Sequence, residues 1–203
     1  HIRTYDYLGE MRASTNPLAY CEGGFLGGHL GIHDKIKPLL KTATASFGIT
    51  ALNELQQLYN KKSIAEDGEF ALEVMKHIND KVAQFKEEDG NLYALYGTPA
   101  ESTIYTFCRK DRERFGIIPN VTDKLYYTNS YHVDVREEID AFSKLKFESQ
   151  FHSISSGGCI SYVEVPNLEK NLEVVEQLIN FIYHNVQYAE INTRPDLCYK
   201  FGF

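Results

Sequence analysis

The sequence predicts an α/β fold with a largely parallel sheet, because strand-like segments alternate along the chain with segments of helical periodicity. Apolar residues recur at helical spacing between Ala71 and Phe85, which is typical of an amphipathic helix. The small and β-branched run from Thr42 to Ile49 is typical of a buried strand. With 203 residues, of which 43% are hydrophobic and 24% charged, the chain can bury a sizeable core.

Glycines and capping residues suggest where each element begins and ends. Asp34 is expected to cap a short first helix, and Gly90 and Gly116 are expected to end two later helices. The elements expected in chain order are a helix to about 41, a strand over 42–49, helices over 52–59 and 67–88, a strand over 92–96, a helix over 99–114, a partly extended segment over 126–135, a helix over 136–147, a strand over 159–165, a helix over 168–182 and a strand over 186–191.

Composition excludes several classes of protein. A formal charge of -7 argues against a surface that coats DNA or RNA, which needs clustered Lys and Arg. No apolar run approaches the roughly 20 residues of a membrane span, and no secretory leader is visible. Four scattered cysteines form no CxxC pair, so we expect reduced thiols and a cytoplasmic protein. Because the chain starts at His1 rather than Met, we expect it to be part of a longer polypeptide.

Residues 97–103 carry the pattern of a phosphate-binding turn between a strand and a helix. Thr98 is a good N-cap, Pro99 suits a first helical position, and Glu101 completes a capping box with Thr98. The free N–H groups of such a helix would point outward at the carboxyl edge of the sheet, where α/β proteins bind phosphates. The candidate ligands are Gly97, Thr98, Ala100, Glu101, Ser102 and Thr103. The alternative is a capped helix with no ligand.

Cys21 lies in a glycine-rich segment, residues 12–33, that is too long and irregular for an ordinary loop. Three interpretations stay open. Cys21 is a small buried residue, or a nucleophile activated by His29 or His33, or a one-electron site. The last would require a neutral thiol held in a dry pocket.

Several segments together resemble the anaerobic (class III, glycyl-radical) ribonucleotide reductases, over essentially the whole chain. The matching segments, in order, are Met11–Pro17 with Tyr20–Gly24, Ala43–Ile49, Gly97–Ser102, Tyr127–Val133, Ser156–Gly158 and Tyr188–Asn192. The resemblance implies half of a ten-stranded α/β barrel with mainly parallel strands, preceded by a Gly-rich finger loop. It implies a finger loop and lead-in over 1–33, a half-barrel domain over 34–197 and the truncated start of a metal knuckle over 198–203.

The resemblance also implies a reaction, the reduction of ribonucleoside triphosphates to deoxyribonucleotides for DNA replication. Cys21 would be the transient thiyl radical that takes the 3′-hydrogen of the substrate. The 97–103 turn would bind the substrate phosphates. The further candidates for lining the pocket are Ser46, Asn129, Ser130 and His132.

The cofactors and partners implied are a glycyl radical, zinc, a radical-SAM activating enzyme and a second copy of the enzyme in a homodimer. The radical and the zinc site would lie outside this chain or be broken in it: Cys198 would be a ligand only in an intact knuckle, and Phe201 stands where a second Cys is expected. The chain alone is therefore expected to be inactive. Cys108 and Cys159 are interpreted as packing residues. The resemblance leaves open whether the reductant is formate or a dithiol protein.

Three alternatives remain at this point. One is another glycyl-radical enzyme, which would not need a phosphate turn. The second is a noncatalytic nucleotide-binding module, in which Cys21 would have no chemical role. The third is a hydrolase with a Cys–His pair, whose thiol would react quickly with alkylating agents.

Overall fold

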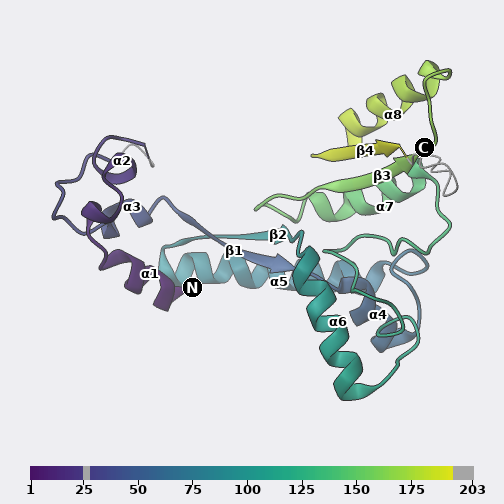
Figure 1. Cartoon of the computed structure of the whole chain (residues 1–203), viewed down its shortest axis with the longest axis horizontal. Helices are drawn as coiled ribbons and strands as arrows, with labels where there is room; N and C mark the ends of the chain where they lie inside the picture. The colour runs from purple at the N-terminus through teal and green to yellow at the C-terminus, as the bar shows by residue number, and fades with distance from the viewer. Residues whose placement is uncertain (25–27, 194–203) are drawn as a thin grey trace, which may run out of the picture. The chain divides into compact units, whose positions relative to one another are not determined.

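Helices and strands alternate along most of the chain, as the α/β class requires (Figure 1). The computed structural model describes residues 1–24 and 28–193. The elements are α1 (Ile2–Gly9), the 3-10 turn η1 (Ala13–Thr15), α2 (Pro17–Tyr20), α3 (Lys37–Leu40), β1 (Thr44–Ile49), α4 (Leu52–Asn60), α5 (Glu69–Asp89), β2 (Leu92–Gly97), α6 (Glu101–Phe115), α7 (Ala141–His152), β3 (Ser161–Val165), α8 (Leu172–Asn185) and β4 (Ala189–Thr193).

The strands pair in two sheets within the described part of the chain. Strand β1 pairs with β2, and β3 pairs with β4. The β3–β4 pair is parallel, with Ser161 opposite Ala189 and Val165 opposite Thr193. Parallel neighbours need a long crossover, and α8 supplies it. The predicted α/β class with parallel strands is therefore confirmed, as two separate two-stranded sheets. Across residues 1–24 and 28–193, no helix is both long and apolar enough to cross a membrane.

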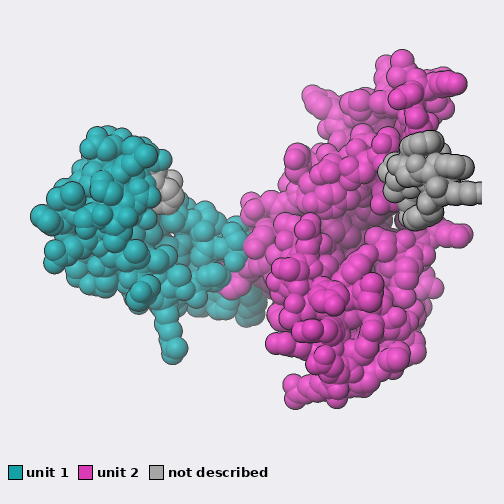
Figure 2. Space-filling model, in the orientation of Figure 1, with its two compact units in different colours: residues 1–46, 81–94 teal, residues 47–80, 95–203 magenta. Residues whose placement is uncertain are grey.

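The chain divides into two compact units, which Figure 2 colours separately. The first unit contains residues 1–46 and 81–94, and the second contains residues 47–80 and 95–203.

In the first unit, backbone hydrogen bonds join the two ends of the glycine-rich segment. The Ala13 N–H donates to the Asp34 carbonyl at 2.8 Å, and the Ile36 N–H donates to the Met11 carbonyl at 3.0 Å. These hydrogen bonds hold the two ends of the segment together, and the short helix α2 lies between them.

The second unit contains three hydrophobic clusters. The first packs α4, α5 and α7 around β2, and its buried members are Leu52, Ile64, Ala71, Met75, Leu95, Tyr131 and Phe151. The second lies between α6 and the loop that follows it, with Ile104, Cys108, Val121 and Tyr127. The third packs α7 and α8 against β3, with Leu145, Val163, Val165 and Leu178. Helical spacing in the sequence identified the α5 members of the first cluster correctly.

The structure differs from several sequence-based predictions of local structure. Strand β1 is not buried, because its residues alternate between exposed and half-buried. Asp34 does not cap the short helix α3, whose N-cap is Ile36. Residues 126–135 contain no strand; they are irregular, with turns at 130, 131 and 135. The helix predicted over 136–147 begins at Ala141, because the Asp140 carboxylate accepts hydrogen bonds from the Phe142 and Ser143 N–H groups and fixes the start there. Helix α1 (Ile2–Gly9) was not predicted.

A buried carboxylate, Glu148, connects α7 to the segment before it and to β3. Its oxygens accept hydrogen bonds from the Val133 N–H at 3.1 Å and from the Ser161 hydroxyl at 2.6 Å. Lys144 pairs with it at 3.0 Å and His132 at 3.2 Å. Burial alone raises the pKa of Glu148, but His132, Lys144 and Ser161 outweigh burial and lower the pKa to about 2.

This network predicts acid sensitivity. Because the pKa of Glu148 falls from 4.5 to about 2 on folding, its contribution is complete above pH 4.5 and is lost as the pH falls toward 2. The contribution is at most about 3 kcal/mol. Urea unfolding between pH 7 and 3.5 should give a shallower loss of stability for Glu148→Gln than for the wild type. Glu176→Gln, an exposed change on α8, should keep the wild-type slope, and equal slopes for all three proteins would contradict the prediction.

Candidate functional site

The predicted phosphate turn joins β2 to α6, but its cap differs from the expected one. Helix α6 begins at Glu101, its N-cap is Ala100, and no side chain within the turn caps it. The capping box between Thr98 and Glu101 is therefore wrong, and Glu101 is exposed. The Ala100 N–H instead donates to the Asn129 Oδ1 at 2.9 Å. A residue from a distant loop thus caps this helix.

The first turn of α6 leaves N–H groups available to a ligand. The first helical hydrogen bond is the one from the Ile104 N–H to the Ala100 carbonyl, at 2.8 Å. The N–H groups of Glu101, Ser102 and Thr103 precede it, so they have no acceptor within the helix. The side chains of Ser102 and Thr103 are exposed beside them. With the partial positive charge of the helix end, these groups suit an anion.

Ser130 lies so close to the turn that a side chain at position 97 would require Ser130 to move. A Cβ on Gly97 would lie within 3.0 Å of the Ser130 Oγ, closer than real Cβ contacts. Ser130 is 2% exposed and has a φ of 52°, a left-handed conformation that is rare for a residue with a side chain. Its hydroxyl is buried and has no hydrogen-bond partner among the described residues. The loop over 127–133 therefore presses directly against the end of β2.

Thr98 lies between the ends of the two paired strands. Its N–H donates to the Ile49 carbonyl of β1 at 3.1 Å. Its Oγ1 occupies the space that a Cβ on Gly48 would need, so glycine at position 48 makes room for it. The Oγ1 atoms of Thr98 and Thr50 are both buried without a hydrogen-bond partner in the described part of the chain. With Ser130, three hydroxyls beside the ends of these strands are available for further hydrogen bonds.

His132 follows the same loop, but its recorded contacts are with other elements. Its Nδ1 is 3.2 Å from the Glu148 Oε2 of α7, and its ring lies edge-on to Tyr162 of β3. The side chain is buried. The structure thus brings Gly97, Ala100, Asn129 and Ser130 together, whereas His132 joins the α7–β3 network.

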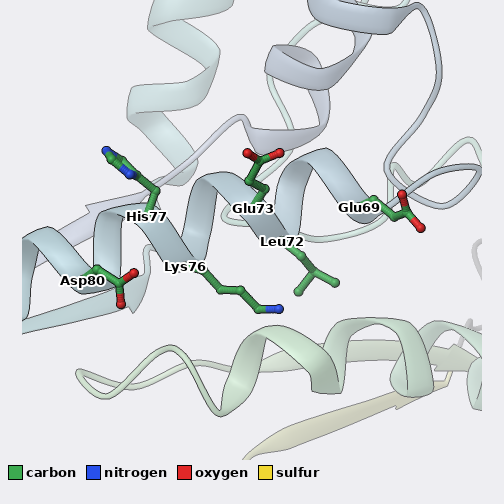
Figure 3. Close-up of a pocket in the computed structure, with 6 residues that line it drawn as sticks. All are labelled: Glu69, Leu72, Glu73, Lys76, His77 and Asp80. Carbon is green, nitrogen blue, oxygen red and sulfur yellow. The ribbon is translucent and has the colours of Figure 1, made fainter.

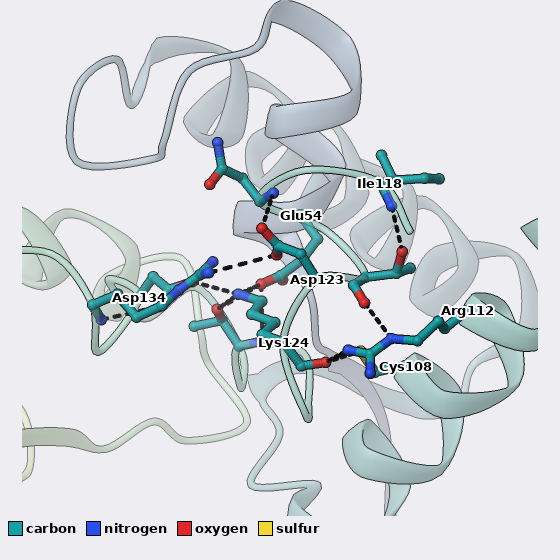
Figure 4. A network of polar contacts seen from close by, with 11 residues as sticks. Glu54, Cys108, Arg112, Ile118, Asp123, Lys124 and Asp134 are labelled. Atoms are coloured by element: carbon teal, nitrogen blue, oxygen red, sulfur yellow. Dashed lines mark hydrogen bonds and ion pairs between the residues drawn. The ribbon is translucent and has the colours of Figure 1, made fainter. Parts of the chain in front are cut away.

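A buried polar network, which no sequence motif indicated, supports the loop (Figure 4). The Glu54 carboxylate of α4 accepts hydrogen bonds from the Thr128 N–H and hydroxyl, and it pairs with Lys124. Lys124 also pairs with Asp134. Arg112 of α6 donates to the backbone carbonyl of Lys124. Glu54 lies in a polar stretch of α4, and only its burial distinguishes it from the other polar residues there. Burial cannot be read from the sequence, so sequence analysis missed this residue.

Burial and charge act in opposite directions on Asp134. Desolvation raises its pKa, but hydrogen bonds from Arg136 and Lys124 outweigh desolvation and lower the pKa to about 2. Asp134 therefore stays ionised at neutral pH and remains a partner for Lys124.

Cys21 and Ser46 belong to the first unit. Cys21 follows α2 directly; its N–H donates to the Pro17 carbonyl at 2.8 Å, and the side chain is half-buried. The His29 Nδ1 lies 3.3 Å from the Cys21 carbonyl oxygen, so the recorded contact of this imidazole is with backbone rather than with sulfur. Ser46 is exposed on β1.

The other cysteines within the described ranges are packing residues, as predicted for Cys108 and Cys159. Cys108 is fully buried in the α6 cluster, and Cys159 packs at the edge of the first cluster. Burial raises the pKa of both thiols. Cys198 and Phe201 lie outside the described residues. Among residues 1–24 and 28–193, no group of three or more His, Cys, Asp or Glu side chains could hold a metal ion.

A surface hollow along α5 contains none of the predicted site residues. Figure 3 shows its lining, which is Glu69, Leu72, Glu73, Lys76, His77 and Asp80. The side chains leave the helix in different directions and carry mixed charge. The hollow therefore lacks the convergent polar groups in a mostly apolar cleft that are typical of a small-ligand site.

Comparison with known proteins gives one consistent result. The family model described as anaerobic ribonucleoside-triphosphate reductase matches residues 2–203. The anaerobic ribonucleoside-triphosphate reductase of Haemophilus influenzae is 36% identical over 202 residues, which cover 97% of this chain and 28% of that protein. The enzyme of the same name from Enterobacteria phage T4 is 35% identical over 194 residues, which cover 95% of this chain and 31% of that protein. The chain spans less than a third of the length of these relatives.

The fold agrees with that of a solved anaerobic ribonucleotide reductase. The crystal structure of the anaerobic ribonucleotide reductase from Thermotoga maritima with dATP bound in the specificity site superposes with a TM-score of 0.61. The match covers 75% of this chain and 26% of that one, at 20% sequence identity. At this identity the match shows the fold alone.

The contact between Gly97 and Ser130 predicts a double-mutant result. Gly97→Ala should lower the free energy of unfolding by about 1–3 kcal/mol, because the new Cβ overlaps the Ser130 Oγ. Ser130→Gly removes that oxygen and also the left-handed strain. In the Ser130→Gly background, Gly97→Ala should then have a clearly smaller effect, with only the tight contact to the Tyr131 ring at 3.3 Å left, which urea denaturation of all four proteins would measure. Additive effects would refute the close approach.

Proposed function

This chain belongs to the anaerobic ribonucleoside-triphosphate reductase family, and from that premise we propose that it forms part of the substrate site of such an enzyme. The complete enzyme would reduce ribonucleoside triphosphates to deoxyribonucleotides. The observation that carries the proposal is the β2–α6 turn. There, helix-start N–H groups, exposed hydroxyls and three buried hydroxyls without a partner among the described residues lie at or beside the ends of two paired strands.

The turn suits a triphosphate in both charge and geometry. Backbone N–H groups at a helix start donate to phosphate oxygens without a neutralising cation. Ser102 and Thr103 would add hydroxyl donors, and Gly97 and Thr98 bring the backbone close to the ligand. The hydroxyls of Ser130 and Thr98 are buried deeper and suit the neutral, hydroxyl-bearing ribose. Asn129 would keep the N-terminus of α6 in position.

Cys21 would carry the radical step. Its thiyl radical takes a hydrogen atom from the ribose C3′, which forms an S–H bond and a carbon radical. The 2′-hydroxyl then takes up a proton and leaves as water. Two electrons and a proton from formate or a dithiol reduce the resulting species, and the thiol returns its hydrogen atom to C3′. The S–H and ribose C–H bonds are similar in strength, so the transfer is reversible.

The family implies further components for the complete enzyme. A glycyl radical, formed by a radical-SAM activating enzyme, would supply the initial oxidation of Cys21. Pairing into a homodimer belongs to the same proposal. Because the glycyl radical would lie outside this chain, the chain by itself should give no product.

Removal of the two hydroxyls tests the phosphate site. In the complete reductase that contains this chain, Ser102→Ala with Thr103→Val should raise the KM for ribonucleoside triphosphate by about tenfold, because two donors to a charged oxygen are lost. Ser143→Ala removes a hydroxyl from the corresponding first-turn position of α7 and should leave the KM unchanged. An unchanged KM in the double variant would contradict the proposal that these hydroxyls bind the substrate phosphates.

Cys21→Ser tests the radical site in the same enzyme. A hydroxyl cannot replace the thiol in hydrogen-atom transfer, so deoxynucleotide formation should fall below detection under anaerobic conditions with the activating enzyme. Nucleotide binding should persist. The matched control is Cys159→Ser, a half-buried thiol outside the site, which should keep most of the activity. Full activity of Cys21→Ser would instead support the noncatalytic nucleotide-binding module.

A further inference from the structure

We propose that Glu54 is a positioning residue for the triphosphate site: it fixes the loop over Thr128–Ser130, and that loop in turn holds the β2–α6 turn. The inference rests on the proposed function of the turn. No sequence motif includes Glu54, and its hydrogen bonds and ion pair within the described part of the chain are with Thr128 and Lys124. It would act only through the loop.

Glu54 binds the loop at its first residue, Thr128. The side chain is 3% exposed, and its Oε1 accepts hydrogen bonds from the Thr128 N–H at 3.0 Å and from the Thr128 Oγ1 at 2.7 Å. Lys124 pairs with the same oxygen and lies 3.1 Å from the Thr128 Oγ1. The carboxylate thereby fixes both the backbone and the side chain of Thr128.

The start of α4 holds the loop at two further points. The Ala51 N–H donates to the Thr128 carbonyl at 2.9 Å, and the Leu52 N–H donates to the Ser130 carbonyl at 3.2 Å. Asn129 lies between these points, and its side chain reaches the other way to the Ala100 N–H. A continuous path therefore runs from α4 through three loop residues to the N-terminus of α6.

Backbone strain explains why the loop needs an anchor. Ala51 and Ser130 have φ angles of 59° and 52°, and both carry side chains. Such conformations cost about 1–3 kcal/mol each and persist only where the surroundings hold them. Without the anchor, the loop would relax, withdraw Asn129 from Ala100 and move Ser130 away from Gly97.

Fold stability alone explains Glu54 poorly. A buried ion pair is weak evidence for stability, because desolvation of both charges offsets their attraction. In addition, Glu54 Oε2 is buried with no hydrogen-bond partner among the described residues, so half of the carboxylate gains nothing in return for its burial. The other oxygen, Oε1, receives three donors: the Thr128 N–H, the Thr128 hydroxyl and the Lys124 ammonium group. This arrangement favours a fixed orientation of Thr128 over a gain in overall stability.

The test compares KM and kcat in the complete reductase. Glu54→Ala should raise the KM for ribonucleoside triphosphate by about tenfold and change kcat by less than about threefold, because binding is impaired while the thiol is untouched. Glu54→Gln keeps an oxygen that can accept from Thr128 and should recover most of the affinity. Gln56→Leu is the matched control: Gln56 is buried on the same helix, but it binds the Ser63 and Asp67 carbonyls rather than the loop. It should lower the melting temperature without raising KM.

A second variant covers the case in which Glu54→Ala does not fold. Thr128→Val keeps the shape and the backbone N–H but loses the hydroxyl donor to Glu54, so KM should rise by about threefold with little loss of stability. A wild-type KM in Thr128→Val, or in folded Glu54→Ala, would overturn the inference while the proposed function stands, provided that the Ser102 and Thr103 variant still raises KM. If that variant and Cys21→Ser both behave as wild type, the proposed function itself has failed.

Discussion

The second unit is organised around buried charge that must be paired. Glu54 enters the interior from α4, and the described structure gives it Lys124 and the two donors of Thr128 as partners. Lys124 in turn needs Asp134. An unpaired charge at this depth would cost several kcal/mol, so the path of the loop between these residues is determined by electrostatics as much as by apolar packing. The loop over 127–134 has no regular secondary structure, yet it is among the most buried parts of the chain.

This fixed loop determines which residues the strand ends can carry. The side chain of Ser130 occupies the space beside position 97, and Thr98 occupies the space beside position 48, so both positions are glycine. The glycines allow backbone and hydroxyl groups to approach one another without intervening Cβ atoms. As a result, several buried hydroxyls lack partners in the described part of the chain. Unpaired buried donors are unfavourable in isolation, and a polar ligand would relieve that penalty.

The sequence was sufficient for the parts that depend on local patterns. The helical spacing of Ala71 and Met75 located the helix and its buried face, and β-branched runs located the strands. The cap of α6 was not predictable in this way. Thr98 has the right residue type, but the helix begins only at Glu101, and the Thr98 Oγ1 lies against Gly48 instead. Asn129 binds the Ala100 N–H from a different part of the chain. Glu54 escaped notice for the same reason. Its importance arises from partners more than seventy positions away in sequence, and periodicity carries no information about such pairs.

The residue that caps α6, Asn129, is uncharged, and this affects whether the turn can bind an anion. A capping box would have fixed the Glu101 carboxylate against the first turn of α6, where a phosphate would meet its negative charge. In the structure Glu101 is exposed, so water and salt screen its charge. Asn129 satisfies the Ala100 N–H with an amide oxygen that carries no net charge, which leaves the following N–H groups and the helix dipole available to an anion. Replacing a local carboxylate cap with a distant amide thus retains the order of the turn and removes a source of repulsion, and the buried charge network holds that amide in place.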